Sequence, residues 1–256
     1  MMKSRLEDRV AVVTGAGHGI GKAYAHRLAS EGAAVVIAEL DAAAATAAAD
    51  ELKAGGARAL AVPTDVADRA ATEAMARAAV EAFGRIDILI NNAAMFSTVP
   101  MSRVPFDQID PAEWEKMMAV NLRGIWNTCR AVVPEMRRNR YGKIVNISSS
   151  TVFERTGTRI HYVTSKAGVI GFTRTLAAEL GPDGICVNCV APGSTLSEEN
   201  PDESTVSFRS AAASHRALAR LQTPKDLVGT IAFFASPDSD FITGQTLVVD
   251  GGSVFH

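Results

Sequence analysis

Short apolar runs alternate with longer segments of helix-forming residues along the whole chain. The apolar runs show little alternation with polar residues, which indicates strands that are buried on both faces. Segments of helical length between such strands are typical of a parallel sheet with helices on both sides. The predicted strands are Val10–Thr14, Ala34–Ala38, Arg58–Val62, Ile86–Ile90, Lys143–Ile147, Ile185–Val190 and Thr246–Val249. The predicted helical segments are Ile20–Ser30, Ala42–Lys53, Arg69–Phe83, Pro111–Arg138, His161–Leu180 and Pro224–Ala235.

This order of elements predicts an α/β protein: a Rossmann fold with a seven-stranded, doubly wound parallel sheet and helices on both faces. No change in composition divides the chain, so residues 1–256 are expected to form a single domain. The Pro111–Arg138 segment is expected to contain two helices, because residues 120–124 interrupt it. Two long segments without a regular pattern, Met95–Asp110 and Pro192–His215, follow predicted strands. Ligands bind beyond the carboxyl ends of such strands, so residues 193–216 are expected to form a lid over the site.

Composition narrows the possible partners and compartments. The formal net charge of −2 gives no reason to expect nucleic acid or an anionic membrane as a partner. No apolar run reaches the roughly 18 residues that span a bilayer, and Met1–Arg9 lacks the apolar stretch of a signal peptide. Three cysteines fit a reducing compartment, so a cytoplasmic location is expected. Cys186 and Cys189 lie three apart on a predicted strand and thus on opposite faces, so no metal site is expected.

A glycine-rich turn, Thr14-Gly15-Ala16-Gly17-His18-Gly19-Ile20-Gly21, joins the first strand to the first helix. Glycines allow the backbone to approach a pyrophosphate closely, and the helix N-terminus supplies free N–H donors. The spacing differs from the commonest dinucleotide fingerprint, so the motif is a weak signal by itself. Its position directly after the first strand strengthens the prediction of a bound dinucleotide.

Glu39 ends the second strand, 18 residues beyond Gly21, close to the position of the acid that binds the adenosine ribose. A carboxylate there accepts hydrogen bonds from the ribose hydroxyls and repels a 2′-phosphate. Neither Leu40 nor His18 supplies a permanent positive charge, so we predict NAD rather than NADP. A surface glutamate at a strand end is the alternative. After the third strand, Asp65 and Val66 are placed to contact the adenine.

Tyr162 and Lys166 lie four residues apart on a predicted helix and therefore share one face. A nearby ammonium favours the phenolate, so Lys166 is expected to lower the pKa of Tyr162 and make it a usable acid or base. A surface Tyr–Lys pair without chemistry is the alternative. The run Ser148-Ser149-Ser150 ends the fifth strand, where a hydroxyl can bind a substrate carbonyl. The serines lack the flanking glycines of a hydrolase elbow, which disfavours a serine hydrolase.

Taken together, these motifs resemble the short-chain dehydrogenase/reductase family over nearly the whole chain. The matching pieces also include Asn91-Asn92-Ala93-Ala94, Asn121 and Pro192-Gly193. The resemblance implies catalytic roles for Asn121, Ser149, Tyr162 and Lys166, with Tyr162 as the proton donor or acceptor and Asn121 holding a water. It implies that the cofactor contacts Gly15, His18, Gly19, Ile20, Gly21, Glu39, Leu40, Asp65, Val66, Asn92, Ala93, Tyr162, Lys166, Pro192, Gly193 and Thr195. The chain departs from the family pattern at Ala94, where glycine is usual, and at Ser197, where threonine is usual.

The C-terminal stretch Phe241–His256 is similar to bacterial secondary-alcohol dehydrogenases of the 1-phenylethanol type and, less closely, to 3-oxoacyl-carrier-protein reductases. We expect an NAD-dependent enzyme that interconverts a hydrophobic, cyclic or aromatic secondary alcohol and its ketone. Substrate contacts are expected from Ser149, Phe96, Val152, Phe153 and Tyr162, although Phe96 and Phe153 could instead pack in the core. Arg155 and Arg159 could receive an acidic carrier protein, but Glu154, Glu198 and Glu199 argue against it. A non-catalytic NAD-binding regulator is a further alternative. Relatives imply a homotetramer, and a dimer stays open.

Overall fold

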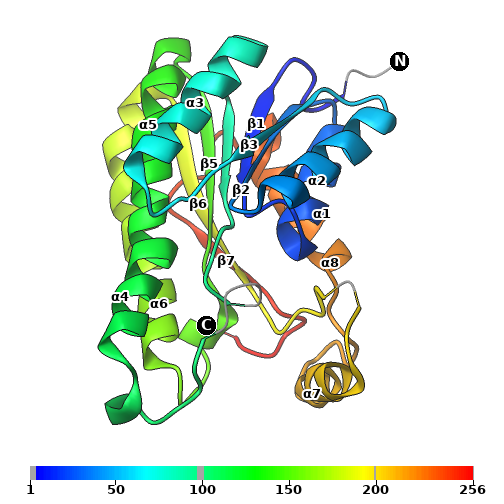
Figure 1. Ribbon diagram of the computed structural model, residues 1–256, viewed down its shortest axis with the longest axis vertical. Helices are drawn as coiled ribbons and strands as arrows, with labels where there is room; N and C mark the ends of the chain where they lie inside the picture. The colour runs from blue at the N-terminus through cyan, green and yellow to red at the C-terminus, as the bar shows by residue number, and fades with distance from the viewer. Residues whose placement is uncertain (1–3, 97–100, 199, 256) are drawn as a thin grey trace.

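The computed structural model describes residues 4–96, 101–198 and 200–255 and has an α/β architecture. Seven parallel strands form one sheet in the order β3-β2-β1-β4-β5-β6-β7. Helices cover both faces of this sheet (Figure 1). The strands are β1 (Val10–Thr14), β2 (Ala34–Glu39), β3 (Ala59–Pro63), β4 (Ile88–Asn91), β5 (Gly142–Ile147), β6 (Ile185–Pro192) and β7 (Thr246–Val249). The predicted fold class and each predicted strand are therefore confirmed, with boundaries that shift by one or two residues.

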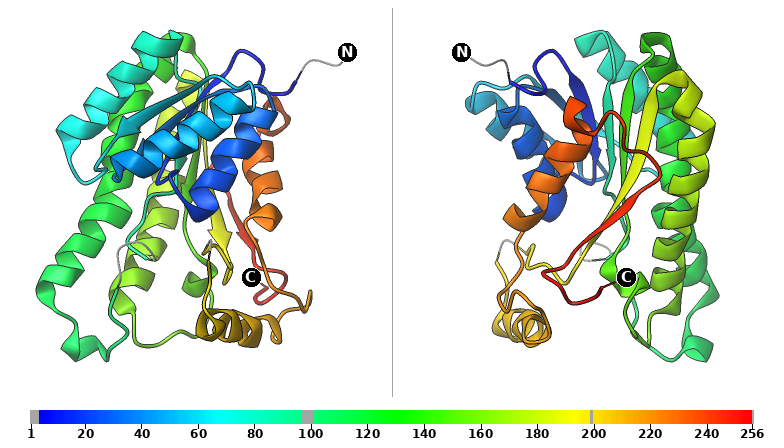
Figure 2. Two further views of the ribbon diagram at one scale, coloured as in Figure 1. Left: turned by 45° about the vertical axis from the view of Figure 1, so that its right-hand side comes forward. Right: turned by 180° about the vertical axis from the view of Figure 1, so that it is seen from behind.

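Two hydrophobic layers hold the helices to the sheet. One face packs against α1 (Gly19–Ser30), α2 (Ala42–Ala54) and α8 (Lys225–Ala235), and the other face packs against α3 (Arg69–Phe83), α5 (Gly124–Asn139) and α6 (Ile160–Leu180). Figure 2 shows these two layers from two further directions. Because both faces are covered, β1 is buried along its whole length, which explains its continuous apolar sequence. Within the described ranges, no helix is long and apolar enough to cross a membrane.

Local sequence signals set several helix boundaries. The Asp41 carboxylate accepts hydrogen bonds from the backbone N–H groups of Ala43 and Ala44 and so begins α2. Asp68 caps α3 in the same way through the N–H of Ala70. Each cap satisfies N–H groups that lack a partner in the first turn of a helix. These helices thus begin where an acidic residue precedes an alanine-rich run.

The expected interruption near Asn121 is a turn of π-helix rather than a loop. Helix α4 (Pro111–Met118) continues into a π-helical segment, Ala119–Arg123, which leads directly into α5. Such turns occur often at functional sites, because the extra residue redirects one side chain. Here the redirected segment carries Asn121, which is completely buried.

The segment after β6 is only partly irregular, so the prediction that all of Pro192–His215 lacks regular structure was wrong. Residues Glu203–Ala213 form helix α7. The Asp202 carboxylate caps it by accepting a hydrogen bond from the N–H of Thr205, and alanines at 211–213 favour its last turn. Helix α7 lies apart from the two helical layers, at the end of the molecule where the C-terminus lies (Figure 1).

The two cysteines of the C-x-x-C pattern lie in different surroundings, as the strand periodicity predicts. Cys189 is fully buried in the layer beneath α5 and α6. Cys186 lies within 3.7 Å of the Lys143 ammonium and points toward the carbonyl of Asp240. All three cysteines are free thiols. Among the described residues, no group of three or more His, Cys, Asp or Glu side chains is arranged to hold a metal ion.

Candidate active site

A cavity of about 780 Å³ lies beyond the carboxyl ends of the central strands. Its walls come from the segments that follow β1 to β6, which the strand order brings to one edge of the sheet. This is the position where ligands bind in doubly wound sheets. Every residue predicted to contact a cofactor lines this cavity, namely Gly15, His18, Gly19, Ile20, Gly21, Glu39, Leu40, Asp65, Val66, Asn92, Ala93, Tyr162, Lys166, Pro192, Gly193 and Thr195.

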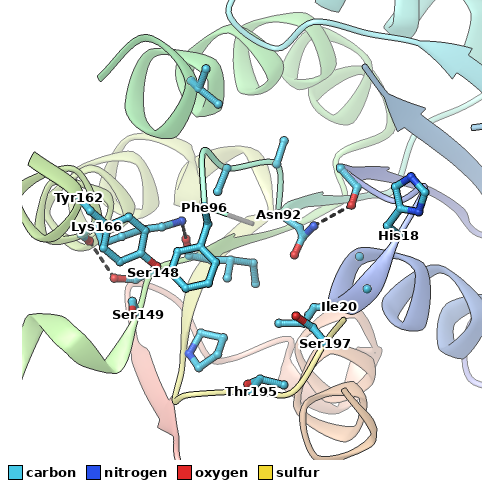
Figure 3. A pocket seen from close by; sticks show the side chains of 18 of the residues that line it. His18, Ile20, Asn92, Phe96, Ser148, Ser149, Tyr162, Lys166, Thr195 and Ser197 are labelled. Carbon is cyan, nitrogen blue, oxygen red and sulfur yellow. Dashed lines mark hydrogen bonds between the residues drawn. The ribbon is translucent and has the colours of Figure 1, made fainter. Parts of the chain in front are cut away.

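The glycine turn is packed so closely that side chains do not fit at two of its positions. A Cβ added at Gly21 would lie 2.1 Å from the Gly15 carbonyl oxygen. At Gly15, where φ is +62°, a Cβ would lie 2.8 Å from the Cα of Ala93. Asn92 secures the turn from the other side, because its side-chain N–H₂ donates to the carbonyls of Thr14 and Gly15 (Figure 3). The turn is therefore a rigid backbone cradle at the start of α1, which fits a pyrophosphate.

The Glu39 carboxylate is held at the edge of this cradle by backbone donors. One of its oxygens accepts from the N–H of Gly17 at 3.0 Å, and the other accepts from the N–H groups of Leu40 at 2.8 Å and Asp41 at 3.3 Å. Gly17 is needed for this arrangement, since a Cβ there would lie 2.8 Å from the Cγ of Glu39. The carboxylate thus occupies a fixed position in the cavity wall, and the structure fits the expected nucleoside-binding role.

The opposite side of the expected adenine site is also rigid. The Asp65 carboxylate accepts a hydrogen bond from the N–H of Ala67, which closes the turn after β3. The Val66 carbonyl accepts from the side chain of Asn127, which α5 supplies. Asp65 and Val66 both line the cavity. The sequence alone had placed them only after the third strand.

Tyr162, Lys166 and Ser149 meet at the inner end of the cavity (Figure 3). Tyr162 and Lys166 share a face of α6, and the Lys166 ammonium lies 5.9 Å from the centre of the Tyr162 ring. That ammonium donates to the Ile147 carbonyl at 2.9 Å, which fixes it against β5. Ser149 is the second residue after β5, and its hydroxyl accepts from the hydroxyl of Thr151 at 2.9 Å. The three side chains are therefore positioned by buried strand and helix ends rather than by mobile loops.

The titration behaviour of this cluster differs from the sequence expectation. Burial raises the pKa of Tyr162 above its ordinary value. The hydrogen bond to Ser149 and the charges of Arg159 and Arg209 act in the opposite direction and lower that pKa. Lys166 is not among the groups that act most strongly on this pKa, and its ammonium donates to the Ile147 carbonyl instead of to the Tyr162 phenol. Burial also lowers the pKa of Lys166 itself, to about 8.

Asn121 lies behind the cluster rather than in the cavity wall. Its side-chain oxygen accepts from the N–H of Met95 at 2.7 Å, and its N–H₂ donates to the hydroxyl of Ser165 at 3.1 Å. Ser165 in turn donates to the carbonyl of Tyr162 at 2.7 Å. Asn121 therefore ties the segment after β4 to the helix that carries Tyr162.

The apolar substrate contacts are only partly where the sequence suggested. Phe96 lines the cavity, and its ring packs against that of Tyr162 with centroids 5.3 Å apart. Val152 and Phe153, which were expected as substrate contacts, are not among the described residues that line the cavity. Val152 ends a 3₁₀ turn after Ser149 and Phe153 follows it, and both side chains pack against the hydrophobic layer beneath α5 and α6. Glu199 and residues 97–100 of the Met95–Asp110 segment lie outside the described residues.

The sequence reasoning did not predict several charged residues of the cavity wall as substrate contacts. Arg159, Arg209, Glu154 and Glu198 all line the cavity. Arg159 stands three residues before Tyr162 and directly before α6, so its closeness in sequence to Tyr162 was the available signal. Arg209 had no such signal, because it comes from α7, whose position depends on the tertiary fold.

Comparison with known proteins identifies the family of the chain. A family model described as enoyl-(acyl carrier protein) reductase matches residues 15–254. The chain belongs to the short-chain dehydrogenase/reductase family. It is 40% identical over 250 residues to the (2S)-[(R)-hydroxy(phenyl)methyl]succinyl-CoA dehydrogenase subunit BbsD of Thauera aromatica, which covers 96% of this chain and 97% of that protein.

Two further relatives agree with this placement. The 3-oxoacyl-[acyl-carrier-protein] reductase FabG of Staphylococcus aureus is 37% identical over 243 residues, which span 94% of this chain and 96% of that protein. The crystal structure of a protein from Sinorhizobium meliloti 1021, described as a short-chain alcohol dehydrogenase, superposes with a TM-score of 0.89 at 32% identity and covers 98% of both chains. Members of this short-chain dehydrogenase/reductase family are NAD(P)-dependent oxidoreductases that act on CH–OH groups, and this chain is one of them.

Proposed function

We propose that the protein is an NAD-dependent dehydrogenase that interconverts a hydrophobic, cyclic or aromatic secondary alcohol and its ketone. The observation that carries the proposal is the meeting of Tyr162 and Ser149 in the same cavity as the glycine cradle, with Phe96 packed over the tyrosine ring. A phenol, a hydroxyl and an apolar wall at one point suit a carbinol with an apolar substituent. The Val152 and Phe153 side chains are not part of this proposed pocket.

The chain supplies proton transfer and orientation. When bound, the nicotinamide cofactor supplies the chemistry of hydride transfer to or from the carbinol carbon. The Ser149 hydroxyl binds the substrate oxygen, and the Tyr162 phenolate takes the proton from the alcohol as the carbonyl forms. In the reverse direction, the Tyr162 phenol returns that proton to the oxygen. Lys166 lines the same cavity, with its ammonium anchored on the Ile147 carbonyl, and Asn121 acts through its hydrogen bonds to Met95 and Ser165.

The preference for NAD rests on Glu39. Its carboxylate is fixed by three backbone N–H groups at the edge of the glycine cradle. A ribose with free hydroxyls can donate hydrogen bonds to this group, whereas a phosphate is repelled by it.

A 3-oxoacyl-carrier-protein reductase is the second candidate, and the 37% identity to FabG favours it. Such an enzyme would bind an acidic partner at the mouth of the cavity. Arg159 and Arg155 could serve that partner, but Glu154 and Glu198 add negative charge there. Turnover of a 3-oxoacyl thioester with NADPH in preference to every secondary alcohol would support this second candidate.

The test of the proposal is turnover of a panel of aromatic and cyclic secondary alcohols with NAD, followed by Tyr162→Phe. We expect the substitution to lower kcat by about 10²- to 10⁴-fold, the usual contribution of a positioned acid or base. NAD binding should persist, because the ring still packs against Phe96. Tyr24→Phe is a matched control: Tyr24 is fully buried outside the cavity, and among the described residues its hydroxyl has no hydrogen-bond partner. Full activity of the Tyr162→Phe protein would refute the assigned acid/base and would suit a non-catalytic regulator.

The remaining proposals concern assembly and location. We propose a homotetramer that pairs the helices of residues 122–138 and 161–180, with Gly168 and Gly171 permitting close approach. Light scattering after size exclusion would distinguish it from a dimer. We also propose that the single domain acts in the cytoplasm, and that residues 193–216, including α7, move as a lid over bound substrate.

A further inference from the structure

Two arginines border the cavity close to Tyr162, and their surroundings differ. Arg209 is almost fully buried, and its guanidinium donates to the Ser194 hydroxyl at 3.2 Å and to the Glu198 carboxylate at 2.9 Å. It also lies 5.9 Å from the centre of the Phe96 ring. Arg209 is therefore held in place by the segment after β6.

Arg159 has no comparable set of partners. It lies in the cavity wall directly before α6, three residues ahead of Tyr162, and it is half-buried. Across the described ranges, its guanidinium forms no ion pair and no hydrogen bond, and only longer-range charges act on it. Burial lowers the pKa of Arg159, as do the charges of Arg103 and Arg209, whereas Glu154 acts in the opposite direction. A half-buried cation without a hydrogen-bonded partner loses hydration, and longer-range attraction to Glu154 replaces only part of that loss.

The neighbouring carboxylates do not complete this site. Glu198 is engaged by Arg209, and Glu154 accepts a hydrogen bond from the hydroxyl of Ser150. Among the described residues that line the cavity near Tyr162, Arg159 and Arg209 thus face Glu154 and Glu198. Neither carboxylate pairs with Arg159, which borders the same cavity as the Tyr162 phenol.

We propose that Arg159 binds a carboxylate of the substrate, so that the enzyme acts on hydroxy acids with an apolar body and on the matching oxo acids. The planar guanidinium matches a carboxylate in two parallel hydrogen bonds. Arg159 is the residue before α6, Tyr162 lies in the first turn of that helix, and both line the same cavity, so one small substrate can place its carboxylate at Arg159 and its carbinol at Tyr162. The phosphate of a phosphopantetheine thioester is separated from the acyl carbonyl by the whole pantetheine arm, so it does not fit this position. The inference rests on the proposed secondary-alcohol chemistry of the same site.

The test compares substrates that differ only in the anion. The probes are 3-hydroxy-3-phenylpropanoate, its methyl ester, its coenzyme A thioester and 1-phenylethanol. We expect wild-type kcat/KM to be higher for the acid than for the ester. In Arg159→Gln the ratio of acid to ester should fall by about tenfold to a hundredfold, the worth of a hydrogen bond to a charged group. The ratio cancels any effect of Arg159 on the pKa of Tyr162, because both substrates use the same phenol.

Arg155→Gln is the matched control. Arg155 is exposed, does not line the cavity and carries the same charge four residues earlier, so its ratio should stay at the wild-type value. Arg159→Lys should recover part of the preference for the acid. Inhibition by 3-phenylpropanoate, compared with 3-phenylpropanamide, gives a second measurement on the wild-type protein alone, and only the acid should inhibit strongly.

The outcomes separate this inference from the function on which it rests. Turnover of 1-phenylethanol with an acid-to-ester ratio of one or less, or a ratio that Arg159→Gln leaves unchanged, would overturn the carboxylate site and leave the dehydrogenase intact. A preference for the coenzyme A thioester over the free acid would do the same and would assign the anion to pantetheine. Failure to oxidise any of these alcohols would overturn the proposed function itself.

Discussion

The charge of Glu39 should determine which dinucleotide the enzyme uses, and Glu39→Gln tests this with almost no change in shape. Glutamine retains one oxygen that can accept from Gly17 or from Leu40 and Asp41, the three backbone donors that fix the carboxylate. The substitution removes the negative charge that would oppose a 2′-phosphate. It also leaves one set of N–H donors without an acceptor.

The magnitude follows from the position of the carboxylate. Two unit charges about 4 Å apart interact with about 1 kcal/mol in water and about 4 kcal/mol near a protein surface, and Glu39 is half-buried. Removing the charge should therefore improve NADP binding by roughly 1–4 kcal/mol, which is about fivefold to a thousandfold. Loss of one hydrogen bond costs about 0.5–1.5 kcal/mol and should weaken NAD binding several-fold.

The assay is the kcat/KM for NAD and for NADP with one alcohol held at saturation. We expect the wild type to favour NAD and Glu39→Gln to shift the NADP-to-NAD ratio upward by at least about tenfold. Glu51→Gln removes an exposed carboxylate that is paired with Lys22 outside the cavity and should not change the ratio. A wild type that favours NADP, or a ratio that Glu39→Gln does not change, would refute the reasoning.

Three further predictions concern the same cavity. Because burial raises the pKa of Tyr162, the phenolate forms only at alkaline pH. Alcohol oxidation should therefore accelerate as pH rises, while ketone reduction should slow. Equal pH profiles in both directions would contradict this. Gly21→Ala should abolish NAD binding as measured by calorimetry, since its Cβ would lie 2.1 Å from the Gly15 carbonyl oxygen, and an unchanged Kd would show that the turn can rearrange. Asn121→Leu should lower the free energy of unfolding by about 1–3 kcal/mol in urea titrations, because the N–H of Met95 loses its buried acceptor; a stability equal to wild type would disprove that role.

Much of the fold could be predicted because local sequence and tertiary structure agree. Strands such as Val10–Thr14 are apolar at almost every position, because a strand that is buried on both faces has no position for an exposed polar side chain. Acidic caps such as Asp41 and Asp68 mark where helices begin. The helix of Glu203–Ala213 was missed even though Asp202 caps it, because it lies outside the sheet layers and has a weak apolar pattern.

Some features of the candidate site were predictable from the sequence, and others depend on the tertiary structure. The sequence by itself determined the glycine turn, Glu39 after the second strand and the Tyr162–Lys166 spacing, because each depends on the chain within one turn or one strand end. Only the tertiary structure decided that Val152 and Phe153 pack beneath α5 and α6, that Lys166 points at the Ile147 carbonyl, and that Arg209 reaches the cavity from α7. These outcomes depend on contacts between residues far apart in the chain and on burial, which raises the pKa of Tyr162 regardless of its helical neighbour.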